Sequence, residues 1–135
     1  MSKRIFITVV LSIFMVAGSA FAAGSQDAPA AGGAKQVVIG ITMQGNQSGF
    51  IQYITSGMWE WQKNNAPNVK LEVVFADDDA AKQLSQVETF IAKKVDAIII
   101  NPVDKVQGAT AVDAAFKAGI PVFTVNTTTT SKNVT

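Results

Sequence analysis

The chain has 135 residues and contains neither cysteine nor histidine. These absences exclude disulfides, thiol catalysis, lipid attachment through an N-terminal cysteine, Ser-His-Asp catalysis and most zinc sites. Eleven basic residues stand against ten acidic ones, so the chain has no basic surplus of the kind that marks nucleic-acid binding.

The first 22 residues have the pattern of a secretory signal peptide. Lys3 and Arg4 form a positive start, residues 5–16 are an apolar run, and residues 20–22 (Ala-Phe-Ala) offer small residues at a cleavage position. The run of 12 residues is shorter than the roughly 20 that a membrane-spanning helix needs. We therefore predict a periplasmic or otherwise exported protein that is cleaved after Ala22 and keeps no stable membrane anchor.

Residues 23–35 are small, polar and aperiodic, which predicts a flexible spacer before a folded part over residues 36–135. Once Lys3 and Arg4 are removed, nine lysines face ten acidic residues and no arginine remains. The folded part therefore offers no bidentate guanidinium clamp for a carboxylate or phosphate. The composition favours a neutral polar ligand over an anionic one.

From residue 36 onward, apolar runs alternate with amphipathic stretches. We predict strands over residues 36–43, 69–76, 95–100 and 121–125, and helices over residues 50–65, 80–94 and 106–118. The strands begin about 30 residues apart, which is the spacing of β-α-β units. The predicted fold class is α/β, a doubly wound and mostly parallel sheet with helices on both faces.

Several local patterns give sharper expectations. Residues 98–100 are apolar on both faces, as in a central strand, whereas residues 69–72 alternate, as in a strand nearer the edge. The first helix carries one apolar stripe of Phe50, Ile51, Ile54, Met58 and Trp61. Gly57 lies within that stripe, where we expect it to permit close packing against a strand. In the third helix we expect Ala109, Val112 and Phe116 to be buried.

Residues 44–50 (Gln-Gly-Asn-Gln-Ser-Gly-Phe) follow the first strand. Ligands of open α/β sheets bind outside the carboxyl ends of the strands, so we interpret this loop as one wall of a binding site. It matches neither G-x-x-x-x-G-K-S/T nor G-x-G-x-x-G, which argues against a nucleotide cofactor. Its amides and hydroxyl suit a neutral polar ligand, on which Phe50 could stack. The alternative is an ordinary turn with Phe50 in the core.

Two further loops begin at the same edge of the sheet, at the carboxyl ends of the third and fourth strands. Asn101 ends the third strand and is a candidate for lining the cleft, although the following proline alone explains the strand end. Asn126 and Thr127 follow the fourth strand, with an exposed threonine-rich loop as the alternative. Residues 77–79 are three aspartates before the second helix, which we interpret as helix caps rather than a metal site, because adjacent residues rarely converge on one ion.

Together these motifs resemble the periplasmic sugar-binding proteins of the ribose-binding type, which are the substrate-binding components of ABC importers. The resemblance covers the chain from about residue 36 to its end. It is carried by residues 38–42 (Val-Ile-Gly-Ile-Thr), 48–50 (Ser-Gly-Phe), 82–88 (Lys-Gln-Leu-Ser-Gln-Val-Glu), 95–102 (Val-Asp-Ala-Ile-Ile-Ile-Asn-Pro) and 118–125 (Ala-Gly-Ile-Pro-Val-Phe-Thr-Val).

The resemblance implies two similar α/β lobes that close on a sugar, of which residues 36–135 are an incomplete N-terminal lobe. In relatives the first loop contributes an amide or hydroxyl and one or two aromatics, which match Ser48, Phe50 and Ile51. Ile51 departs from the commoner aromatic. Relatives often carry Asp-Arg after the fourth strand, where this chain has Asn126 and Thr127. The ligand could therefore be another pentose, a hexose or a polyol rather than ribose.

We accordingly expect a non-enzymatic, exported solute-binding protein fragment that captures a small polar ligand, a monosaccharide above all, for an ABC importer permease. We expect no cofactor, no metal and no nucleic acid. The alternative is a sensory ligand-binding domain feeding a chemoreceptor or kinase, and an exported flavodoxin-like or receiver-like enzyme is disfavoured. The predicted ligand-binding residues are Gln44, Asn46, Gln47, Ser48, Phe50, Ile51, Asn101, Asn126 and Thr127.

Overall fold

Strands and helices alternate along the chain in the computed structural model, which describes residues 35–135. The elements are β1 (Val37–Met43), α1 (Gly49–Asn65), β2 (Val69–Phe75), α2 (Ala80–Lys93), β3 (Ala97–Ile100), α3 (Lys105–Lys117) and β4 (Val122–Thr124). Each predicted element is present, with ends shifted by two residues or fewer. No helix in this range is long and apolar enough to cross a membrane. The predicted signal peptide and residues 23–34 of the spacer lie outside the described residues.

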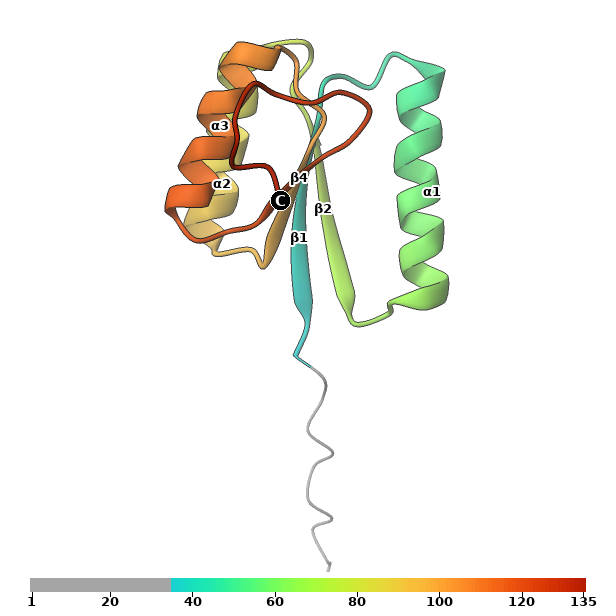
Figure 1. Ribbon diagram of the computed structural model, residues 1–135. Helices are drawn as coiled ribbons and strands as arrows, with labels where there is room; N and C mark the ends of the chain where they lie inside the picture. Colours follow the sequence, from blue (N-terminus) through green and yellow to red (C-terminus); the bar gives the residue numbers. More distant parts are fainter. Residues whose placement is uncertain (1–34) are drawn as a thin grey trace, which may run out of the picture. The chain divides into compact units, whose positions relative to one another are not determined.

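The strands form one sheet in the order β2-β1-β3-β4, and every pairing is parallel. Helix α1 covers one face, while α2 and α3 lie side by side on the other (Figure 1). The predicted α/β, doubly wound fold class is confirmed, with β3 inside the sheet and β2 at its edge. The chain turns to one side of β1 for β2 and then crosses back to β3. The loops after β1 and β3 therefore flank the point where the strand order switches, which is where such sheets bind ligands.

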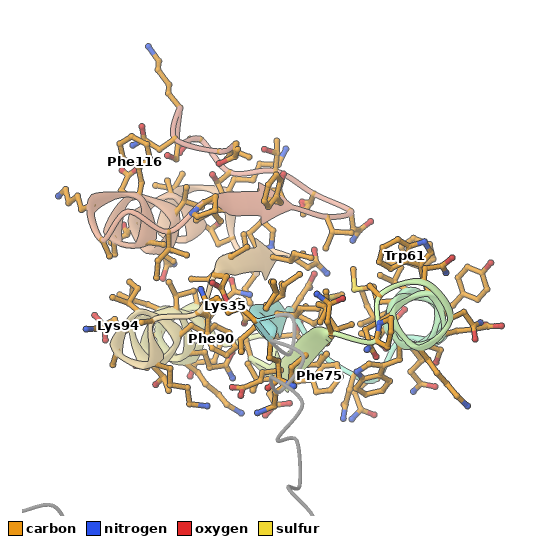
Figure 2. All side chains as sticks on the ribbon, turned by 90° about the horizontal axis from the view of Figure 1, so that it is seen from below. Lys35, Trp61, Phe75, Phe90, Lys94 and Phe116 are labelled. Atoms are coloured by element: carbon orange, nitrogen blue, oxygen red, sulfur yellow. The ribbon has the colours of Figure 1, made fainter. Side chains whose placement is uncertain are left out.

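The face toward α2 and α3 holds the larger apolar cluster. Ile98, Ile100 and Val122 from the sheet meet Phe90 from α2, and all four are almost completely buried. The Phe90 ring lies directly on Gly40 in β1, where an added Cβ atom would come within 2.6 Å of the ring. Figure 2 shows this ring between α2 and the sheet. Glycine at position 40 is what lets an aromatic side chain pack against the middle of a central strand.

The face toward α1 is covered less completely. Of the predicted apolar stripe, Ile51 is buried and Ile54 and Met58 pack partly against the sheet. Phe50 and Trp61 are exposed by 57% and 61%, so the stripe is wider than the surface it meets. The expectation for Gly57 is wrong, because a Cβ atom there would meet nothing within 4 Å.

Helix α3 buries small residues rather than the expected aromatic. Gly108, Ala111 and Ala115 are buried together with Val112, whereas Phe116 is 56% exposed. A Cβ atom on Gly108 would lie 2.9 Å from the Cβ of Pro102. The close approach of this helix to its neighbours therefore selects small side chains and turns the larger Phe116 outward.

The segment after β4 is held against α3 through Asp113. The Ser131 hydroxyl and the Asn133 amide both donate to Asp113 Oδ1, at 2.5 and 2.8 Å. These two hydrogen bonds lower the pKa of the Asp113 carboxyl below its usual value, and the bond from Ser131 has the larger effect. The Thr130 N–H also donates to the Lys105 carbonyl at 3.0 Å. The residues that follow Asn126 are therefore anchored to the layer beneath them.

Candidate functional site

The loop after β1 is ordered by its own polar groups. Ser48 caps α1, with its hydroxyl accepting a hydrogen bond from the Phe50 N–H at 3.3 Å. The Gln52 amide donates to the Asn46 carbonyl at 2.9 Å, and the Gln47 amide donates to Asn46 Oδ1 at 2.8 Å. These contacts hold the loop over the carboxyl end of the sheet. They also leave the Phe50 ring at the start of α1 largely in contact with solvent.

The three aspartates after β2 have three different surroundings. Asp79 caps α2, accepting hydrogen bonds from the Ala81 and Lys82 N–H groups at 2.8 and 3.1 Å, which confirms the capping prediction for this residue. Asp77 pairs with the Lys82 ammonium. Asp78 turns toward the first loop, where its N–H donates to the Gln44 carbonyl at 2.8 Å. Asp77 and Asp78 both have left-handed backbones, with φ of 54° and 59°.

These loops and the loop after β4 enclose a hollow of about 310 Å³ at the carboxyl edge of the sheet. It is lined by Gln44, Gly45, Gln47, Ser48, Phe50, Ile51, Asp78 and Asn126. Ile51 also belongs to the apolar cluster with Ile41 and Met43, so it joins the hollow to the core. Asn126 reaches the hollow from a left-handed backbone with φ of 64°, a conformation that asparagine tolerates better than most residues.

Six of the nine predicted ligand-binding residues line this hollow, and three do not. The six are Gln44, Gln47, Ser48, Phe50, Ile51 and Asn126. Asn46 supports the loop instead, through its carbonyl and its side-chain oxygen. Thr127 follows Asn126, and its N–H turns back to the Val125 carbonyl at 2.7 Å. Asn101 is completely buried beneath the edge rather than in the hollow.

Asn101 lies at the centre of a buried polar connection between β1 and β3. Its N–H donates to the Thr42 carbonyl at 2.9 Å, and its own carbonyl accepts from the Gln83 amide at 2.9 Å. Gln83 Oε1 in turn accepts from the Val103 N–H at 2.9 Å. The side-chain amide atoms of Asn101 meet no partner among residues 35–135, so they retain their own hydrogen-bonding capacity.

A second glutamine of α2 extends the same connection to β2. The Thr42 hydroxyl donates to Gln86 Oε1 at 2.6 Å, and the Gln86 amide donates to the Phe75 carbonyl at 2.8 Å. Gln83 and Gln86 together bridge the carboxyl ends of three strands from the side of α2. The sequence contained a signal for them, because they share the helical stripe of Val87 and Phe90 and are the polar members of a core-facing row.

Asp78 is the residue of the hollow that the sequence did not single out. The three adjacent aspartates pointed to capping, and only the structure separates their roles. A usable signal was position, since residue 78 follows a strand whose carboxyl end lies at the same edge as residues 44–50. In the hollow it is the single carboxylate among amide, hydroxyl, aromatic and aliphatic groups.

The family model described as "periplasmic binding protein domain" matches residues 13–135 of this chain. The ribose import binding protein of Bacillus subtilis (strain 168) is 30% identical over 127 residues, which is 93% of this chain and 41% of that protein. The chain thus spans less than half the length of this relative.

Solved structures show the same likeness. A solute-binding protein of an ABC transporter from Bacillus halodurans C-125, with bound myo-inositol, is 37% identical with a TM-score of 0.65 over 72% of this chain and 33% of its own. The fructose-binding periplasmic domain of a hybrid two-component system is 27% identical with a TM-score of 0.64, over 73% of this chain and 32% of its own. These relatives are solute-binding proteins and domains, and the family implies a periplasmic or otherwise exported location.

Proposed function

The chain belongs to the periplasmic binding protein family, and we propose that its protein captures a sugar or similar small polar ligand for an ABC importer. In this proposal residues 36–135 supply one wall of a cleft between two lobes. The observation that carries it is the hollow at the carboxyl edge, which gathers the loops after β1, β2 and β4. Its volume of about 310 Å³ is at the small end of ligand pockets, which matches a ligand of monosaccharide size.

The lining of the hollow suits hydroxyl-rich ligands. The hollow is lined by the side-chain amides of Gln44, Gln47 and Asn126. Each amide can donate a hydrogen bond to a ligand hydroxyl group or accept one from it. The Phe50 ring, exposed by 57%, offers a flat apolar surface for the C–H face of a sugar ring. Burying that surface under a ligand is favourable because it removes apolar area from water.

Closure by a second wall supplies the rest of the binding energy in this proposal. A hollow that is open on one side leaves the ligand's other hydroxyls in water, so contacts made only after closure would drive a hinge motion. Residues 35–135 alone should therefore bind sugars weakly or not at all. Micromolar binding by this segment in calorimetry would contradict the two-lobe arrangement.

The proposal is tested by calorimetry on the full-length mature protein with a panel of pentoses, hexoses and polyols. We expect one or more of them to bind, and Phe50→Ala to weaken binding of that ligand about fivefold, because an aromatic contact is worth on the order of 1 kcal/mol. Phe116→Ala is the matched control, since Phe116 is equally exposed but lies outside the hollow. Equal effects of the two substitutions, or no binding to any sugar or polyol, would reject the proposal.

A sensory role is the second candidate, and the similarity to the fructose-binding domain of a hybrid two-component system favours it. The two roles share the hollow and differ in what the closed protein contacts. Deleting the gene and measuring uptake of the radiolabelled ligand separates them, because a transport component is needed for uptake at low ligand concentration. Normal uptake combined with lost transcriptional induction would favour sensing.

Residues 1–22 are proposed to be a signal peptide and residues 23–35 a spacer, both outside the part that carries the hollow. Lys35, at the end of the proposed spacer, already pairs with Asp96 at 2.9 Å. Intact mass and N-terminal sequencing of the exported protein should find Ala23 as the first residue. A protein that retains Met1 after export would contradict cleavage.

A further inference from the structure

The hollow contains one ionisable side chain, and its charge has no partner in the described part of the chain. Asp78 is that side chain, and none of the four ion pairs among residues 35–135 includes it. The nearby Lys82 is paired with Asp77, and no lysine lines the hollow. The two neighbouring aspartates are thus occupied elsewhere, which leaves Asp78 as a lone carboxylate facing the ligand space.

The backbone holds Asp78 in this place. Its N–H is bonded to the Gln44 carbonyl at 2.8 Å, and its left-handed φ of 59° directs the residue toward the first loop. The carboxylate lies against Gly45, because a Cβ atom added there would be at ordinary contact distance, 3.5 Å, from Asp78 Oδ2. The carboxylate therefore lies beside the loop that provides most of the lining, rather than over α2.

We propose that Asp78 makes this site selective for ligands that carry an amine, such as amino sugars or amino polyols. This inference rests on the proposed function, since it concerns the same hollow. Covering a lone carboxylate removes it from water, and the cost is offset only by a partner that brings positive charge or strong donors. A ligand ammonium supplies both. The same charge repels sugar acids and sugar phosphates, which agrees with the absence of arginine beyond Arg4.

The alternative is that a basic side chain on the facing wall of the cleft, rather than the ligand, pairs with the Asp78 carboxylate. In that case Asp78 would be neutralised before the ligand arrives, and neutral sugars would bind as well as their amines. The two cases differ in one measurable quantity, the ratio of the dissociation constants of a neutral ligand and its amine analogue.

Calorimetry on the full-length mature protein with three matched pairs measures this ratio. The pairs are D-glucose with D-glucosamine, D-sorbitol with 1-amino-1-deoxy-D-sorbitol, and scyllo-inositol with scyllo-inosamine. For any pair that binds, we expect the amine to bind about tenfold more tightly, because a charge-assisted hydrogen bond exceeds a neutral one by roughly that factor. Asp78→Asn should reduce the ratio to about one, because it weakens binding of the amine member more than binding of the neutral member.

Asp77→Asn is the matched control, because it removes the same charge next to the hollow but from a residue paired with Lys82. Asparagine tolerates the left-handed backbone at both positions, so the two variants should fold alike. A wild-type ratio near one, or a ratio that survives Asp78→Asn, would overturn the inference while leaving sugar binding intact. Failure of all six compounds and of the sugar panel would instead overturn the proposed function.

Discussion

Replacing Gln83 by leucine tests whether the carboxyl edge of the sheet depends on buried hydrogen bonds. The Gln83 side chain is 2% exposed and bonds to the Asn101 carbonyl and the Val103 N–H, both at 2.9 Å. Leucine fills much of the same space but leaves both backbone groups without a partner. Each buried unpaired group costs about 1–3 kcal/mol, and apolar burial of leucine offsets part of this. We expect the free energy of unfolding to fall by about 2–4 kcal/mol.

Urea denaturation followed by circular dichroism measures this loss. Gln107→Leu is the control, because it makes the same chemical change at an exposed position of α3 and should stay within about 0.5 kcal/mol of the wild type. Hydrogen exchange adds a local readout, since the Val103 amide should exchange faster in Gln83→Leu. A loss below about 1 kcal/mol, or equal losses in the two variants, would refute the view that Gln83 stabilises the end of β3 through buried hydrogen bonds.

Other predictions concern two glycines and one ion pair. Gly40→Ala should destabilise the protein by about 1–3 kcal/mol, because its Cβ would lie 2.6 Å from the aromatic ring that packs on it. Gly57→Ala should stabilise it by about 1 kcal/mol, because space there is open and alanine favours helix; the same denaturation assay checks both signs. Hydrogen bonds from Lys70, which has the larger effect, and from Lys93 lower the pKa of Glu72 to about 2. Its stabilising contribution is therefore complete above pH 4.5 and is lost as pH falls through about 2. Lys93→Ala should raise the carboxyl midpoint in an NMR titration, and an unmoved midpoint would contradict this pairing.

The order of elements and the position of the hollow could be predicted because both depend on local pattern. Residues 98–100, apolar on both faces, lie in a strand inside the sheet, and five of the residues 44–50 line the hollow at the carboxyl edge. Parallel β-α-β connections bring the carboxyl ends of all strands to the same edge of the sheet. Residues that are distant in sequence could therefore be assigned to one hollow without coordinates.

The remainder depends on which surfaces meet, and the sequence pattern does not contain that information. Periodicity predicted that Phe116 and Trp61 lie on buried apolar faces, but both are exposed. Helix α3 packs too closely on its neighbours to leave space for a phenylalanine. The apolar stripe of α1 is wider than the part of the sheet that it contacts. Asn101 was assigned to the cleft from its place after β3, yet its backbone joins the network under the edge. Asp78 was missed because three adjacent aspartates look equivalent until their backbones diverge.

Helix α1 has few buried residues, so hydrogen exchange of its amides should respond to ligand binding. Only Ile51 and Thr55 are buried along its 17 residues, whereas the shorter α3 buries four. Local opening therefore costs less free energy at α1 than at α2 or α3, and its amides should exchange hydrogen for deuterium soonest. Ser48 caps α1 and Phe50 lies in its first turn, so a ligand bound in the hollow as proposed would have to leave before the helix opens. At a ligand concentration of 100 times the dissociation constant this linkage adds about 2.7 kcal/mol to the opening. Occupancy of the hollow would then be recorded as slowed exchange along the whole helix, far beyond the atoms the ligand touches.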